Sequence, residues 1–141
     1  MQQRDYILRL IEQIGGALIA LGTMILGRKV DPKRVDQELT AVAGQAGLDL
    51  ELLRGFTEDT LHMFVSPMGE VGPARCWLMA ELLYLDGLQA KLEERMDDAR
   101  MSLRKARMLF TLIEPAGGML VGIPEAAGRV DEIDGHLDEV G

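Results

Sequence analysis

The apolar residues of this chain recur at intervals of three and four positions, which is the spacing of one face of an α-helix. The clearest stripe, near the N-terminus, consists of Ile7, Ile11, Ile14, Leu18, Leu21 and Ile25. The same rhythm returns near the C-terminus at Ala126, Val130, Ile133, Leu137 and Val140. No segment alternates between apolar and polar residues for long, so no β-sheet is expected. The periodicity therefore predicts an all-α protein.

The length and composition agree with a helical domain. The chain has 141 residues, of which 48 % are hydrophobic and only 4 % are aromatic. That size suits one domain with a sizeable core, and a low aromatic content favours helices over a β-sandwich. We expect one domain over residues 1–141, folded as an antiparallel array of about five to seven helices.

The expected helices fall into four segments. Residues 1–29 form a long apolar helix and residues 31–66 form short helices. Residues 73–113 form a helical hairpin. Residues 114–141 comprise a Gly-rich connector and a C-terminal acidic amphipathic helix.

Local signals place several helix ends. Asp31 and Pro32 are suited to the N-cap and the first helical position of one helix. Gly47, followed by Leu48, has the pattern of a left-handed residue that ends a helix. Thr57 is expected to cap a further short helix.

Residues 80–113 resemble a single tetratricopeptide repeat (TPR), in which two antiparallel helices pack at small residues set at fixed offsets. Gly87 and Ala99 are small enough to let two helices approach closely. The matching positions are Leu83, Gly87 and Ala90 on the first helix and Met96, Ala99, Leu103 and Ala106 on the second. The resemblance covers about a quarter of the chain, and no second copy follows at the repeat spacing. A helical hairpin of another family with small residues at its contact would give the same pattern.

Three positions depart from the TPR pattern. Asp86 stands where an apolar residue is usual, Glu94 where Gly is common, and Thr111 where Pro is common. Because a lone repeat cannot bury both of its faces, other helices or another subunit must cover this hairpin.

The chain also resembles a group of small, uncharacterised bacterial proteins that end in a TPR-like hairpin. The resemblance lies in the opening run Asp5-Tyr6-Ile7-Leu8-Arg9-Leu10-Ile11. It implies a helical fold and a bacterial source, and it implies no activity.

The net charge and the cysteine content argue against several classes of partner and against a disulfide-bonded fold. The net charge of −8 argues against binding to nucleic acids and to anionic membranes, and it suits a basic partner. A single cysteine, Cys76, rules out a disulfide within the chain. No N-terminal signal is visible, so the cytoplasm is the expected compartment.

The first helix is apolar nearly all round between Ile14 and Leu26. Such a helix must be buried on more than one side. Its stripe Ile7, Ile11, Ile14, Leu18, Leu21 and Ile25 is therefore expected either in the core or in a homodimer interface, and we favour the homodimer. A membrane anchor is the weaker alternative, because the charge-free run from Gln13 to Gly27 is about fifteen residues and a span needs roughly twenty.

The hairpin offers the best candidate surface for a partner. Leu83, Tyr84, Gly87, Ala90 and Leu103 are expected to line a groove for a helix or peptide, which includes the chain's own C-terminal helix. The second helix of the hairpin carries a basic patch of Arg100, Arg104, Lys105 and Arg107, in which the three arginines lie near one face. We expect these arginines to pair with an acidic peptide or, preferably, with the acidic tail over 131–139.

No group of residues reaches the standard of an active site, so no catalysis, cofactor or metal is predicted. Glu132 and His136 lie one helical turn apart and could hold a cation, but the spacing specifies no third ligand. The carboxylates around the hairpin turn are expected to be exposed, and Cys76 is expected to be a buried structural thiol.

The sequence therefore favours a protein-interaction or structural module. Two alternatives remain open. One is a peripheral membrane protein attached through its first helix, and the other is an enzyme whose pocket gathers polar residues from distant segments.

Overall fold

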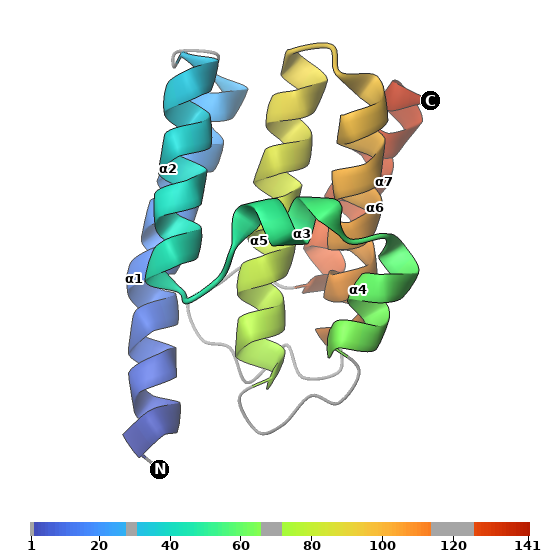
Figure 1. The fold of residues 1–141 in the computed structure, drawn as a ribbon. Coiled ribbons are helices and arrows are strands. Elements are labelled where there is room, and N and C mark those ends of the chain that lie inside the picture. The colour runs from blue at the N-terminus through green and yellow to red at the C-terminus, as the bar shows by residue number, and fades with distance from the viewer. Residues whose placement is uncertain (1, 28–30, 66–71, 114–125) are drawn as a thin grey trace.

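The computed structural model describes residues 2–27, 31–65, 72–113 and 126–141. These residues form seven helices and no strand, which confirms the all-α prediction (Figure 1). The helices are α1 (Gln2–Leu26), α2 (Pro32–Gln45), α3 (Leu50–Gly55), α4 (Glu58–Val65), α5 (Gly72–Leu92), α6 (Met96–Ile113) and α7 (Ala126–Val140). Pro67 and two nearby glycines predict a loop over 66–72. Only Gly72 of that segment is described, and it begins α5 instead. The predicted connector over 116–124 lies outside the described residues.

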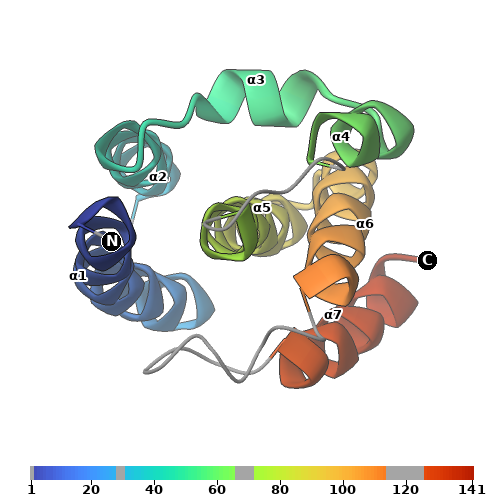
Figure 2. The ribbon, with the colours of Figure 1, turned by 90° about the horizontal axis from the view of Figure 1, so that it is seen from below.

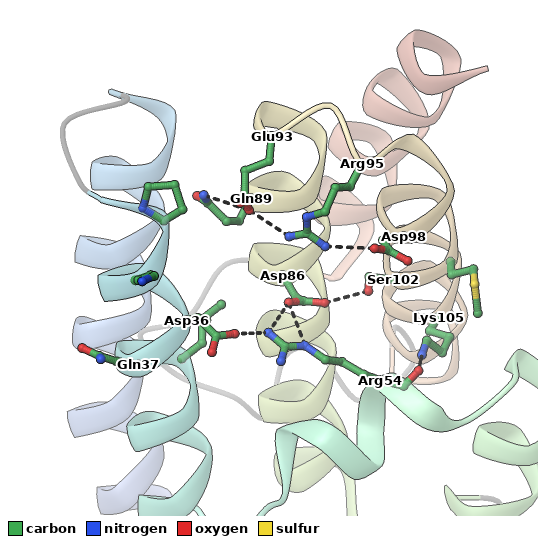
Figure 3. A pocket seen from close by; sticks show the side chains of 14 residues that line it. Asp36, Gln37, Arg54, Asp86, Gln89, Glu93, Arg95, Asp98, Ser102 and Lys105 are labelled. Atoms are coloured by element: carbon green, nitrogen blue, oxygen red, sulfur yellow. Dashed lines mark hydrogen bonds and ion pairs between the residues drawn. The ribbon is translucent and has the colours of Figure 1, made fainter.

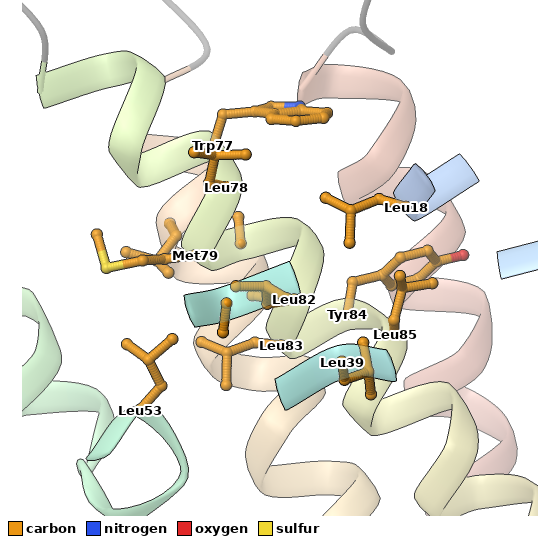
Figure 4. Packing of buried hydrophobic residues seen from close by; sticks show 14 of the residues in the cluster. Leu18, Leu39, Leu53, Trp77, Leu78, Met79, Leu82, Leu83, Tyr84 and Leu85 are labelled. Carbon is orange, nitrogen blue, oxygen red and sulfur yellow. The ribbon is translucent and has the colours of Figure 1, made fainter. Parts of the chain in front are cut away.

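Helix α5 lies at the centre, and the other helices surround it (Figure 2). All ten residues from Glu81 to Ala90 are buried, so this helix has no solvent face over that stretch. A helix that is apolar nearly all round is stable only in such a position. Leu18 of α1, Leu39 of α2 and Leu53 of α3 reach α5 from different sides (Figure 4).

Helices α5 and α6 form the predicted antiparallel hairpin, and its closest approach is at Gly87. A Cβ atom added to Gly87 would lie 2.8 Å from Cγ of Leu103 and 3.3 Å from its backbone nitrogen. Real side chains do not tolerate the shorter distance, so this crossing needs glycine. Ala99, the other small residue singled out, is fully buried.

The turn between α5 and α6 has the geometry of a Schellman motif. The backbone N–H of Arg95 donates to the carbonyl of Ala90 at 2.9 Å, and that of Glu94 donates to the carbonyl of Lys91 at 3.0 Å. Glu94 takes the left-handed conformation that the motif requires, with φ of 62°. The TPR pattern commonly has glycine at this position. Glu94 therefore places a side chain at a position whose left-handed backbone conformation favours glycine.

We expect Glu94→Gly to raise the free energy of unfolding by about 1 kcal/mol, because glycine adopts the left-handed region without the cost that other residues bear. Urea denaturation of the full chain measures the change. Glu94→Ala is the matched control, since it removes the same carboxylate but keeps a Cβ. An equal gain from both variants would attribute the effect to charge and not to backbone strain.

The predicted caps of the short helices are confirmed. The Asp31 carboxylate accepts from the backbone N–H of Lys33 at 3.0 Å, with Pro32 in the first helical position. Gly47 has φ of 72° and ends α2, and Thr57 accepts from the N–H of Thr60 at 3.1 Å.

Candidate functional site

Two hollows lie on different sides of the central helix α5. One is a polar pocket between α2, α3, α5 and α6, with a volume of about 550 Å³. The other is a groove between α1 and α7 with α5 as its floor, with a volume of about 630 Å³. Both are within the size range of ligand sites in proteins.

The polar pocket is organised around Arg54, the last charged residue of α3 (Figure 3). Its guanidinium donates to Oδ1 of Asp86 through Nε at 3.1 Å and Nη2 at 2.7 Å, and to Oδ1 of Asp36 at 2.6 Å. Ser102 donates from Oγ to the second oxygen of Asp86 at 2.9 Å. Burial acts to lower the pKa of Arg54, but these carboxylates outweigh it and raise the pKa. Helices α2, α3, α5 and α6 are thereby joined at one point.

Lys105 of α6 completes this cluster. Its ammonium donates to the carbonyls of Leu53, Arg54 and Phe56 at 2.8, 2.9 and 3.0 Å. These carbonyls belong to the C-terminal end of α3, where four carbonyls lack partners within the helix. The side chain is almost fully buried, and desolvation lowers the pKa of Lys105.

The charged groups of this pocket hold the surrounding helices together. Both oxygens of Asp86 and all three protons of Lys105 are engaged within the chain. The Ser102 hydroxyl donates to Asp86, and that carboxylate is already paired with Arg54. The cluster therefore fixes the position of α3.

The groove has one apolar wall and one charged wall. The apolar wall is a single face of α1, formed by Ile19, Gly22, Thr23 and Leu26 at helical spacing. Ile19 is 45 % exposed and Leu26 is 60 % exposed. The charged wall is a face of α7 that carries Arg129, Asp131, Glu132, His136 and Glu139. Tyr84, Leu85 and Leu88 of α5 lie at the floor.

The charged wall is anchored to α5 by a buried ion pair. Arg129 donates to both oxygens of Glu81, from Nε at 2.6 Å and from Nη2 at 3.1 Å. Glu81 is 1 % exposed, and desolvation raises its pKa while Arg129 acts in the opposite direction. The guanidinium also lies over the Tyr84 ring, 4.8 Å from its centroid.

Further along, Lys91 of α5 joins the C-terminal half of α7. Its ammonium lies 2.9 Å from Nδ1 of His136 and also pairs with Glu139. Because an ammonium only donates, Nδ1 must be the unprotonated acceptor. The Tyr84 hydroxyl donates to Glu132 at 3.0 Å. Desolvation and the charge of Lys91 lower the pKa of His136, against Glu139 and Glu132, which raise it.

We expect the docking of α7 to weaken on acidification. Since the pKa of His136 is lowered on folding, the unfolded chain binds more protons, and stability falls as pH drops below the unfolded value of about 6.5. The slope cannot exceed about 1.4 kcal/mol per pH unit for one proton. Urea denaturation between pH 7.5 and pH 5 measures this slope. His136→Gln should flatten the profile in that range, and an unchanged profile would contradict the assignment.

The hairpin residues predicted to bind a partner are covered by the chain itself. Leu83, Gly87, Ala90 and Leu103 are buried, and Tyr84 is 4 % exposed. Ala90 and Ala99 form a small cluster with Val140 of α7. Helix α7 therefore covers the hairpin at Ala90 and Tyr84, the latter through its hydrogen bond to Glu132. Binding of another protein by these residues stays a prediction.

The apolar stripe of α1 also lies inside the chain where its side chains are described. Ile14, Leu18, Leu21 and Ile25 are at most 5 % exposed and belong to the main core. Of the two alternatives, core or dimer interface, these four positions are in the core. The side chains of Ile7 and Ile11 lie outside what the structure describes, and self-association stays a prediction.

One of the three predicted arginines pairs with the acidic tail over 131–139: Arg107 contacts Asp134 at 2.6 Å. Arg100 donates to the carbonyl of Val140, just beyond that tail, at 3.1 Å, and its ion pair is with Asp97. Arg104 is exposed, with no hydrogen bond or ion pair to any residue that the structure describes.

The remaining candidates from the sequence are the Cys76 thiol and a metal site. Cys76 is fully buried, and burial raises the pKa of its thiol to about 12, so it is a structural thiol as expected. No cluster of three or more His, Cys, Asp or Glu among residues 2–27, 31–65, 72–113 and 126–141 could hold a metal ion. Over the same ranges, no helix combines the length and hydropathy that crossing a bilayer requires.

Sequence reasoning missed the Arg54–Asp86 cluster and the Glu81–Arg129 pair. One signal was present: Asp86 interrupts an otherwise apolar helix and had been noted only as a departure from the TPR pattern. A second signal was the position of Lys105, which shares a helical face with Ser102 and Leu109 and not with the three arginines.

Comparison with models of protein families, with curated proteins and with solved structures finds no match to this chain.

Proposed function

We propose that this chain is a helical protein-interaction module without catalytic activity, and that its binding surface is the groove between α1 and α7. The observation that supports this most directly is the exposed apolar face of α1. Ile19 and Leu26 are 45 % and 60 % exposed, although they face a concave surface lined by the buried side chains of α5. Apolar side chains in a concave surface with a polar rim are typical of a site that a partner covers.

The absence of catalysis in this proposal rests on the polar pocket. Its carboxylates, guanidinium and ammonium hold α3 against the α5–α6 hairpin, as the distances above show. An enzyme needs at least one group free to move a proton or attack a substrate. The paired groups around Arg54 and Lys105 do not offer one.

The TPR-like character of the hairpin and the bacterial resemblance remain part of the proposal. The close approach at Gly87 and the left-handed residue at Glu94 support the TPR-like interpretation. In this proposal the hairpin groove itself holds α7, and the partner binds beside α7 against α1.

The test is selection of peptides on the immobilised full chain from a displayed library of helical sequences. Selected peptides should bind the wild-type chain and lose binding to the double variant Ile19→Ser/Leu26→Ser. The matched control is Leu52→Ser/Met63→Ser, because these side chains are 53 % and 74 % exposed and lie on α3 and α4, away from the groove. Absence of any selected peptide, or equal loss in both double variants, would contradict the proposal.

A further inference from the structure

We infer that the groove between α1 and α7 receives a basic amphipathic helix. The inference rests on the proposed function and names the chemistry of the partner. The apolar side chains of that helix would cover the exposed face of α1, and its Lys and Arg side chains would contact the charged wall on α7.

The apolar wall of the groove packs closely against α5 at Gly22. Gly22 lies between Ile19 and Leu26 on the same face of α1. A Cβ at Gly22 would lie 3.2 Å from Cδ2 of Leu85, so the missing side chain lets α1 approach the buried Leu85 of α5 closely. The apolar contacts that this wall offers to a partner are therefore the exposed side chains of Ile19 and Leu26.

The charged wall is net negative. Arg129 is the only cation that lines the groove among the described residues, and its guanidinium is engaged by Glu81 and Glu132. Three carboxylates line the same wall: Glu132, which pairs with Arg129, Glu139, which pairs with Lys91 of α5, and Asp131. His136 adds no charge near neutral pH, because its Nδ1 accepts from Lys91 and its pKa is lowered. Asp131 is exposed, with no hydrogen bond or ion pair to any residue that the structure describes.

The dimensions suit a short helix. The groove runs from Leu18 to Leu26 along α1 and from Arg129 to Glu139 along α7. At 1.5 Å per residue these walls are about 12 and 15 Å long, which corresponds to two to three turns of helix. An amphipathic helix binds in a groove through apolar side chains at i, i+3, i+4 and i+7, and the two exposed apolar residues of α1, Ile19 and Leu26, lie seven residues apart on one face.

The net charge of the chain favours a basic partner over a second copy. At −8 overall, two copies of this chain repel each other, whereas a cationic helix is attracted and is steered to the acidic wall. The complementary surfaces then determine which face of the helix binds.

The experiment measures fluorescence anisotropy of three labelled 18-residue peptides against the full chain. The first peptide has Leu at helical a and d positions with Lys elsewhere, the second has Glu in place of Lys, and the third is a scrambled form of the first. We expect the first peptide to bind at least tenfold more tightly than the other two, with affinity that falls as salt is raised.

Charge reversal locates the contact. Asp131→Lys should weaken binding of the Lys peptide about three- to tenfold and strengthen binding of the Glu peptide. Asp59→Lys on α4 is the matched control, since it makes the same change in net charge at an exposed site away from the groove. Equal effects from both variants would show general electrostatic attraction and would overturn the inference.

The two proposals fail in distinguishable ways. If library peptides bind through Ile19 and Leu26 but are neutral or acidic, the interaction function stands and the basic partner is wrong. If no peptide of any charge depends on Ile19 and Leu26, the groove is not a binding site and both proposals fall.

Discussion

Arg129→Leu is expected to lower the free energy of unfolding by about 3–5 kcal/mol, because it leaves the Glu81 carboxylate buried without a partner. Glu81 is 1 % exposed and Arg129 is 15 % exposed, so water cannot replace the guanidinium at full strength. The change would also release the start of α7 from α5, since Arg129 contacts both Glu81 and the Tyr84 ring. Thermal and urea denaturation of the full chain measure the loss.

The pH dependence of this variant identifies the cause. Burial raises the pKa of Glu81, and the loss of Arg129 removes the effect that lowers it. With a folded pKa above the unfolded value, stability is greatest below the unfolded pKa and decreases as pH rises. The deficit of Arg129→Leu should therefore shrink between pH 7 and pH 4.

The double variant Glu81→Leu/Arg129→Leu is the matched control. Replacing both members of a buried ion pair by apolar residues is often nearly neutral, whereas removing one member is costly. We expect the double variant to recover most of the stability that Arg129→Leu loses. A deficit that persists in the double variant, or that does not change with pH, would place the effect in packing and not in the unpaired carboxylate.

The helices were predictable because their signals are local. The three–four spacing of apolar residues, the Asp31 cap and the Gly47 C-terminal signal each depend on neighbours within about five positions, and all match the structure. The central position of α5 follows from the same reasoning, although it was not predicted. Its apolar residues point in all directions, and only a helix surrounded by others can bury them.

The candidate site was not predictable in the same way. Glu81 and Arg129 are separated by 48 positions, and Arg54 and Asp86 by 32. No periodicity relates such pairs, because their contact depends on how α3 and α7 cross the hairpin. The groove could not be predicted for the same reason, because α1 and α7, which form its two walls, are far apart in the sequence. The ion pair between Arg107 and Asp134 was a partial exception. The basic residues of α6 and the acidic residues of α7 are both visible in the sequence, so a pairing between them could be predicted.

The departures from the TPR pattern now have physical reasons at two positions. Asp86 is polar because it accepts from Arg54 and Ser102, which attach α3 and α6 to the central helix. Glu94 occupies a left-handed position at the turn. Nothing in the structure explains Thr111, whose hydroxyl donates to the carbonyl of Arg107 within α6. The polar contacts that hold α3 against the hairpin include those of Lys105, and their strength can be measured at that residue.

Lys105→Met is expected to lower the free energy of unfolding by about 3 kcal/mol. Methionine keeps the length of the apolar stem, but it leaves the carbonyls of Leu53, Arg54 and Phe56 without their donor. A buried carbonyl that loses its partner costs about 1–3 kcal/mol, and water can reach two of these three in part. Arg104→Met is the matched control, because it removes a cation from the next, exposed position of α6 and should change stability by less than about 0.5 kcal/mol.

The location of the Lys105 effect is as informative as its size. Because Lys105 holds only the end of α3, hydrogen exchange should accelerate most at the amides of α3 and the start of α4 while the α5–α6 hairpin stays protected. Uniform acceleration would mean that Lys105 supports the hairpin and not α3. Equal losses from Lys105→Met and Arg104→Met would mean that net charge, and not the three carbonyl contacts, determines the stability at this end of the molecule.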